Sequence, residues 1–210
     1  MGRTLHGRLV IATHNAGKLW EMQRLLAPHG VDAISAGELG LPEPPETGTT
    51  FIANARLKAL AAMAATGLPA LADDSGMCVE ALDGAPGVYS ADWAGHPRDF
   101  GAAMDRVERE LLAKGLHGSR ASFNSTLVIA WPDGHEAIFE GSVPGSLVFP
   151  RRGTNGFGYD PIFLPDGESR TFGEMMADEK NAVPEDDRLP ISHRARAFVK
   201  LRAACLQAQP

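Results

Sequence analysis

The sequence has few cysteines and no long apolar run. Its two cysteines, Cys78 and Cys205, lie far apart in 210 residues and match neither a disulfide framework nor the spacing of zinc ligands. The longest apolar stretches are much shorter than the roughly 18 residues that a membrane-spanning helix needs, and none has the context of a signal peptide. We therefore expect a reduced, soluble protein of the cytoplasm with no membrane partner.

The sequence also has fewer basic residues than acidic ones. Twenty Lys and Arg residues against 26 Asp and Glu residues give a net charge of −6. This sign excludes a protein held mainly by the phosphate backbone of nucleic acids or by anionic lipid, although a local basic pocket is compatible with it. The sequence also lacks the aromatic and basic strand pattern of RNA-binding domains. We expect no nucleic-acid partner.

The length and composition are typical of one globular domain. A chain of 210 residues is too short for two large independent domains. Its 44% hydrophobic and 22% charged residues exclude wholesale disorder. We expect residues 1–8 to form a short polar lead and residues 9–210 to form a single domain.

The hydrophobic pattern predicts alternating strands and helices. Strands are expected at residues 9–12, 31–35, 69–72, 77–82, 122–131, 136–143 and 161–164, with 145–149 extending the sheet. Helices are expected at residues 20–26, 51–66, 98–116, 173–179 and 192–207. The turn Pro132-Asp-Gly134 predicts a hairpin between two of the strands. Antiparallel strands in an α/β order favour an α/β fold with a mixed sheet and helices on both faces.

The loop Thr13-His-Asn-Ala-Gly-Lys18 lies between the first expected strand and the first expected helix. Backbone amides at the start of a helix attract anions. The side chains of Thr13 and Asn15 can add hydrogen bonds, and Lys18 can add a full charge. The loop is not a Walker A sequence. It indicates either a phosphate-binding loop or an ordinary strand-to-helix turn.

Three acidic residues form a second candidate group. Asp73 and Asp74 follow an apolar strand, and Glu46 lies in the glycine- and proline-rich loop 37–50. Neighbours in a strand face opposite ways, so only one of the two aspartates can point into a given cleft. Carboxylates suit Mg²⁺, which is usually shared with substrate phosphates, and Glu46 is a reasonable second ligand. The alternative is a pair of turn-forming aspartates completed by Ser75 and Gly76.

Five other candidate residues carry a cationic or an aromatic side chain. Lys58 lies four residues after Asn54 in an alanine-rich helix, where it either extends into solvent or meets an anion. In Thr154-Asn-Gly-Phe-Gly-Tyr-Asp160, glycines flank Phe157, whose ring can stack on a nucleobase. Lys180 and Ser192-His-Arg194 offer donors suited to a carbonyl oxygen. The alternative interpretation is that Ser192 caps a helix and that the cations lie on the surface.

These segments occur in one fixed order along the chain. The motifs are Thr13–Lys18, Glu46–Gly48 with Phe51–Lys58, Ala72–Gly76, Gly84–Gly87 with Tyr89–Ala91, Gly153–Pro161, and Ser192–Arg194. In this order they resemble the inosine triphosphate pyrophosphatase family, also called the Ham1-like family. The similarity runs from residue 9 to about residue 198.

The resemblance implies a long mixed central sheet flanked by helices, with two lobes and an active-site cleft between them. It implies a Mg²⁺-dependent homodimer. The implied reaction is hydrolysis of ITP, dITP and XTP to the nucleoside monophosphate and pyrophosphate, which removes deaminated purines from the nucleotide pool.

The resemblance also implies roles for single residues. Asp74 corresponds to a metal ligand that also acts as the catalytic base, and Ser75 to a substrate contact. We expect Glu46 to be a second metal ligand and Lys58 to neutralise the departing pyrophosphate. The implied triphosphate loop is Thr13, His14, Asn15, Ala16, Gly17 and Lys18. The implied nucleoside contacts are Phe157, Gly158, Tyr159, Asp160, Lys180, His193 and Arg194.

The chain departs from the family pattern in three places. His14 stands where glycine or serine is frequent, and Pro45 stands where an acidic residue often precedes Glu46. Residues 183–190 resemble an acidic insertion between Lys180 and Ser192. Two other functions are compatible with the residues: a phosphatase or pyrimidine-nucleotide pyrophosphatase, and a nucleotide-binding regulator without catalysis.

Overall fold

The computed structural model describes residues 3–184, 186 and 188–206. The chain forms two compact units. The first contains the described residues of Met1–Asp74, Ser125–Gly141 and Ala195–Pro210, and the second contains those of Ser75–Asn124 and Ser142–Arg194. Asp74 is thus the last residue of one unit and Ser75 the first of the other.

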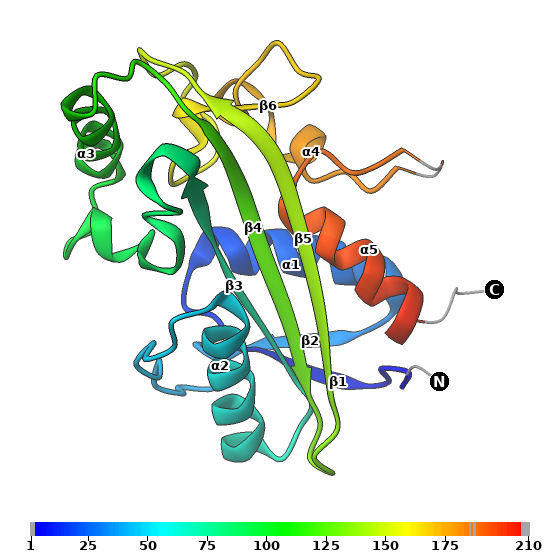
Figure 1. Cartoon of the computed structure of the whole chain (residues 1–210). Helices are drawn as coiled ribbons and strands as arrows, with labels where there is room; N and C mark the ends of the chain where they lie inside the picture. Colours follow the sequence, from blue (N-terminus) through cyan, green and yellow to red (C-terminus); the bar gives the residue numbers. More distant parts are fainter. Residues whose placement is uncertain (1–2, 185, 187, 207–210) are drawn as a thin grey trace. The chain divides into compact units, whose positions relative to one another are not determined.

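The strands form one six-stranded sheet in the order β2-β1-β3-β4-β5-β6 (Figure 1). β1 pairs in parallel with β2 and with β3, whereas β5 and β6 are antiparallel. The strands are β1 (Arg8–Ile11), β2 (Asp32–Ser35), β3 (Ala70–Val79), β4 (Arg120–Ala130), β5 (Glu136–Leu147) and β6 (Phe163–Pro165). The expected α/β fold with a mixed sheet flanked by helices is confirmed.

Five α-helices accompany the sheet in the described part of the chain. They are α1 (Ala16–Leu26), α2 (Phe51–Thr66), α3 (Phe100–Ala113), α4 (Ala177–Lys180) and α5 (His193–Cys205). Short 3₁₀ turns occupy Ala27–His29, Glu80–Leu82, Gly87–Tyr89, Asp92–Ala94, Asp160–Ile162 and Phe172–Glu174. No helix among the described residues is long and apolar enough to cross a membrane.

In the first unit, α2 packs on one face of the strands. Ala70 and Ala72 of β3 belong to the same buried cluster as three alanines of α2. Because side chains alternate along a strand, Asp74 shares the face of Ala70 and Ala72, and Asp73 shares the opposite face with Leu71. The small residues of this cluster thus bring α2 next to the end of the apolar part of β3. The three helical alanines are Ala55, Ala59 and Ala62.

The core of the second unit is larger and more aromatic. The ring of Phe123 on β4 lies 4.8 Å from that of Phe163 and 5.7 Å from that of Phe172. Aliphatic residues of α3 join the same cluster. Aromatic pairs of this kind add about 0.5–1.5 kcal/mol beyond the area they bury. The nucleoside-binding residues expected in residues 157–160 therefore belong to a unit with its own packed core.

The main difference between the predicted elements and the structure is at β3, which ends at Val79, so that residues 80–82 of the expected strand form a 3₁₀ turn. The sequence predicts two strands separated at residues 73–76, but β3 is continuous from Ala70 to Val79. Asp73 and Asp74 are tolerated inside a strand because each finds a cation on its own face. The interpretation of these aspartates as turn-forming residues is therefore wrong.

Smaller differences concern helix ends. The helix expected at 173–179 is instead a 3₁₀ turn, Phe172–Glu174, followed by α4. The closing helix ends at Cys205, and residue 207 of the expected helix lies outside the described residues, as do residues 185 and 187 of the acidic insertion and residues 1–2 of the polar lead. Within the lead, Leu5 is buried and its amide donates to the carbonyl of Cys205.

The N-cap of α2 gives a test of the local structure. The hydroxyl of Thr50 accepts a hydrogen bond from the amide of Ala53, so Thr50→Ala should lower the free energy of unfolding by about 1 kcal/mol. Thr49→Ala, one residue earlier and outside the cap, should change it by less than about 0.5 kcal/mol. Urea denaturation of both variants measures the difference, and equal losses would contradict the assignment of the cap.

Candidate active site

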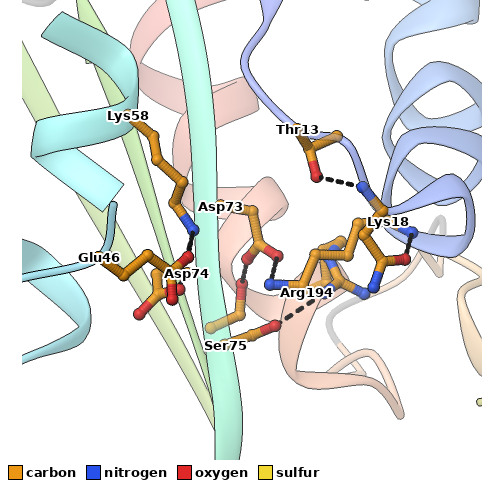
Figure 2. A network of polar contacts seen from close by, with 10 residues as sticks. Thr13, Lys18, Glu46, Lys58, Asp73, Asp74, Ser75 and Arg194 are labelled. Atoms are coloured by element: carbon orange, nitrogen blue, oxygen red, sulfur yellow. Dashed lines mark hydrogen bonds and ion pairs between the residues drawn. The ribbon is translucent and has the colours of Figure 1, made fainter. Parts of the chain in front are cut away.

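The loop from β1 to α1 is held by its own side chains. The hydroxyl of Thr13 accepts a hydrogen bond from the amide of Asn15 at 3.2 Å, and the Asn15 side chain accepts one from the amide of Lys18 at 3.1 Å (Figure 2). Asn15 is therefore the N-cap of α1. The amides of Ala16 and Gly17 lie in the first turn, where the helix itself offers them no acceptor. The loop has the geometry of an anion site at a helix start.

His14 connects this loop to the loop that carries Glu46. The Nε2 atom of its exposed ring lies 2.8 Å from the carbonyl oxygen of Leu41. A glycine or serine at this position could not make the same contact. The departure from the family pattern at His14 thus has a structural consequence.

The two aspartates of β3 point to opposite faces of the strand, as alternation requires (Figure 2). Asp73 lies 3.2 Å from the ammonium of Lys18 and accepts a hydrogen bond from the hydroxyl of Ser125 at 2.6 Å. Both contacts fix the Asp73 carboxylate on the α1 side. Asp73 therefore holds Lys18 rather than joining Asp74 in one carboxylate pair.

On the α2 side, one ammonium group bridges two carboxylates. Lys58 Nζ donates to Glu46 Oε1 at 2.7 Å and to Asp74 Oδ1 at 2.9 Å (Figure 2). The side chains of Lys58 and Asp74 are each only 6% exposed, whereas that of Glu46 is 35% exposed. Lys58 is thus a buried, ion-paired residue, and the solvent-exposed alternative for it is wrong.

Burial and neighbouring charges have opposite effects on the pKa values of Asp74 and Lys58. Burial raises the pKa of the Asp74 carboxyl above its usual value, although the ammonium groups of Lys58 and Lys18 oppose the rise. Burial lowers the pKa of Lys58, but Asp74 and Glu46 outweigh it and hold that pKa above its usual value. Lys58 therefore stays charged, and Asp74 is a stronger base than an exposed aspartate.

The position of Glu46 depends on a close contact between its loop and α2. The amide of Gly48 donates to the side chain of Asn54 at 2.8 Å. A Cβ atom at position 48 would lie 2.6 Å from that side-chain oxygen and 2.7 Å from the Cβ of Ala53, so only glycine fits without a shift. Asn54 and Lys58 are four residues apart and lie on the same face of α2. One helix face thus fixes both ends of the Glu46 segment.

The oxygens of Glu46 and Asp74 suit a hard cation. Among the described residues, Asp74 Oδ2 is buried and has no hydrogen-bond partner, which is costly unless a ligand satisfies it. No group of three or more His, Cys, Asp or Glu side chains that could hold a metal occurs in the described part of the chain. Mg²⁺ commonly takes only one or two carboxylates and completes its shell with water and phosphate oxygens. The donor set fits such an ion.

In the second unit, the residues that precede and begin α5 contact β3 and β4. A guanidinium nitrogen of the buried Arg194 donates to the hydroxyl of Ser75 at 3.0 Å. The ring of His193 stacks on that of Phe123, with centroids 5.0 Å apart and planes 15° apart. Ser192 is buried, and its amide donates to the carbonyl of Lys180. These residues are not surface cations on a simple helix cap.

The loop around Phe157 is held by one ion pair. Asp160 accepts hydrogen bonds from the amide of Phe157 at 3.0 Å and from Lys180 Nζ at 2.8 Å. The same ammonium lies 5.5 Å from the centroid of the partly buried Phe157 ring. Gly156 has a φ of +73°, and a Cβ there would lie 2.0 Å from the Asp160 carboxylate. The loop conformation therefore requires glycine beside the aromatic ring.

Tyr159 points into the core. Its side chain is buried, and its hydroxyl donates to the carbonyl oxygen of Ser90 at 2.9 Å. The hydroxyl of Ser90 in turn accepts from the amide of Met77 and donates to the carbonyl of Gly87. Gly158, which separates Phe157 from Tyr159 in the sequence, has a φ of +69°. Tyr159 thus anchors the Phe157 loop to the segment that follows β3.

Sequence reasoning missed three supporting residues. Ser125 orients Asp73, Asn54 orients the Glu46 loop, and Ser90 anchors Tyr159. Ser125 is one of several polar residues in β4, together with Ser122, Asn124 and Thr126, so the sequence gives no signal that singles it out. Ser90 and Asn54 lie within motifs of the predicted family but had no role assigned to them.

Comparisons with known proteins agree with these motifs. The model of the Ham1 family matches residues 9–204. The structure of a HAM1 protein from Coxiella burnetii superimposes with a TM-score of 0.84 and 38% sequence identity, covering 94% of this chain and 98% of that one.

Two relatives are similar over almost their whole length. The dITP/XTP pyrophosphatase of Rhodopseudomonas palustris is 60% identical, with 98% of this chain and 99% of the relative covered. The dITP/XTP pyrophosphatase of a Bradyrhizobium strain is 61% identical, with 97% of this chain and 96% of the relative covered. On the family match and these identities, the chain belongs to the Ham1 family.

Proposed function

We propose that the protein hydrolyses the non-canonical purine nucleotides dITP, XTP and ITP to the nucleoside monophosphate and pyrophosphate. The observation that carries this proposal is the Glu46–Lys58–Asp74 group, in which Asp74 Oδ2 is buried without a protein partner among the described residues. The names of the relatives, dITP/XTP pyrophosphatase, support the reaction and the substrates.

The candidate phosphate-binding residues belong to the first unit. The amides of Ala16 and Gly17 and the ammonium of Lys18 bind phosphate oxygens, while Thr13 and Asn15 hold the loop in shape. Asp73 keeps Lys18 in place. These donors are fixed before the substrate binds, so they stabilise charge on the leaving pyrophosphate without reorganising.

Asp74 is the proposed catalytic base. Its carboxylate takes a proton from a water molecule, the water oxygen forms a bond to the α-phosphorus, and the bond from that phosphorus to the bridging oxygen of the β-phosphate breaks. The electron pair of the broken bond leaves with pyrophosphate.

Glu46 and Asp74 are the residues that would hold Mg²⁺. When bound there, the ion supplies charge neutralisation to the phosphate oxygens. Lys58 supplies a further positive charge from the same face of β3. Because Glu46 and Asp74 supply only two carboxylates, the remaining ligands of the ion would be water and phosphate oxygens, so the metal and the nucleotide would bind together.

The candidate base-binding residues belong to the second unit. Phe157 stacks on the purine, and Lys180, His193 and Arg194 present donors to the 6-oxygen that inosine and xanthosine carry and adenine lacks. A site whose polar groups would stay unpaired with adenine discriminates against it by roughly 10⁴-fold. In the described residues, Asp160 and Ser75 hold Lys180 and Arg194 in fixed positions. The homodimeric state and the cytoplasmic location stay predictions.

Asp74→Asn tests the catalytic base. We expect pyrophosphate release from dITP and XTP to fall by at least about 10³-fold, because the amide cannot take the proton and binds cations poorly. Asp83→Asn, at a side chain that is 97% exposed, is the matched control and should keep full activity. Separate assays of pyrophosphate and phosphate distinguish a pyrophosphatase from a phosphatase. A folded Asp74→Asn enzyme with near-normal turnover would exclude this role.

Phe157→Ala tests the stacking platform. Loss of a base-stacking ring costs about 1–3 kcal/mol, so KM for dITP and XTP should rise roughly tenfold or more with little change in kcat. Phe157→Tyr keeps the ring and should retain a KM close to that of the unmodified enzyme. Equal KM values for Phe157→Ala and the unmodified enzyme would show that the ring does not touch the base.

A further inference from the structure

Lys58 binds one oxygen of each of the two carboxylates that a divalent cation would share. Its single ammonium contacts both Glu46 Oε1 and Asp74 Oδ1, at 2.7 and 2.9 Å. A metal ion shared by these two carboxylates would lie close to that ammonium, and two cations at such a distance repel strongly in a buried site. The metal and the ammonium therefore compete for the same pair of carboxylates.

The charge balance of the group shows what resolves this competition. Two carboxylates and one ammonium leave one net negative charge, which a divalent cation alone would turn into a net positive charge. An excess charge of either sign is expensive where the Asp74 and Lys58 side chains are each 6% exposed. A polyphosphate that binds with the metal offsets this excess positive charge and gives the ammonium a new acceptor.

The lysine side chain is suited to such an exchange. It carries a compact charge with three donors on a flexible stem, whereas the α2 backbone beneath it is fixed by Ala55, Ala59 and Ala62 in the core. The ammonium can therefore change partners without any movement of the helix. Lys18 is placed differently, because its partner Asp73 lies on the opposite face of β3.

We propose that Lys58 is a placeholder cation that keeps free metal out of the Glu46–Asp74 pair and is transferred to substrate phosphate when metal and nucleotide bind together. This inference rests on the proposed function and adds to it a coupling between the two ligands. Because coupling is reciprocal, the nucleotide raises the affinity for the metal by the same factor as the metal raises the affinity for the nucleotide.

Titration of the protein with Mn²⁺ alone, followed by electron paramagnetic resonance, tests the proposal. Lys58→Met keeps the aliphatic stem and removes the charge, so it should bind free Mn²⁺ about tenfold more tightly than the unmodified protein or better. Lys58→Arg keeps the charge, and Arg56→Met removes an exposed cation of the same helix that pairs with Glu136. Both controls should stay within about twofold of the unmodified protein. Unchanged or weaker Mn²⁺ binding by a folded Lys58→Met protein would overturn the proposal.

A second measurement needs only the unmodified protein. Its affinity for Mn²⁺ should rise at least about tenfold in the presence of α,β-methylene-dITP, which cannot be cleaved at the reacting bond. Equal Mn²⁺ affinity with and without this nucleotide would also overturn the proposal. Failure of the proposed function has a different signature, because the unmodified protein would then release no pyrophosphate from dITP or XTP.

Discussion

The negative charges of two adjacent carboxylates inside a buried strand must each be paired with a separate cation, and this constraint determines the arrangement of the first unit. Alternation along β3 sends Asp73 to the α1 face and Asp74 to the α2 face, so one cation cannot serve both. Lys18 forms an ion pair with Asp73, and Lys58 forms one with Asp74. Removing one partner from a buried ion pair typically costs about 3–5 kcal/mol, because the remaining charge stays buried. The lysines that carry the proposed phosphate chemistry are therefore also part of what keeps β3 continuous.

The surrounding sequence is organised around these two pairs. Alanines on α2 and β3 let the helix lie close enough for Lys58 to reach the strand, and Gly48 lets the Glu46 loop approach Asn54. On the other face, the N-cap Asn15 starts α1 where Lys18 can reach Asp73. Each pair thus joins a segment that can bind phosphate or metal to the central strand. The local choices of small and polar residues point to the same arrangement as the global fold.

Most of the fold could be predicted because its signals are local. The hydrophobic pattern identified β1, α2 from Phe51 to Thr66, and the hairpin of β4 and β5, and the turn residues between them set the boundaries. β3 could not be predicted as one strand, because consecutive aspartates are a turn signal unless distant residues compensate them. The motifs located the candidate site residues, but not which aspartate meets which lysine. That pairing depends on contacts between residues far apart in the sequence. Lys58 and Asp74 are 16 residues apart, and Lys18 and Asp73 are 55 residues apart.

The second unit also contains buried cations that are held by protein partners, near the loop that carries Phe157. Lys180 and Arg194 are buried cations, and each has a defined protein partner in Asp160 or Ser75. Long side chains held in this way lose little further freedom when a ligand binds, so a hydrogen bond to a keto oxygen carries a small entropy cost. Their polar atoms are also costly to leave next to a second donor such as an amino group. In the proposed function, such fixed donors favour selectivity for a keto purine over tight binding of purines in general, so that adenine nucleotides are rejected.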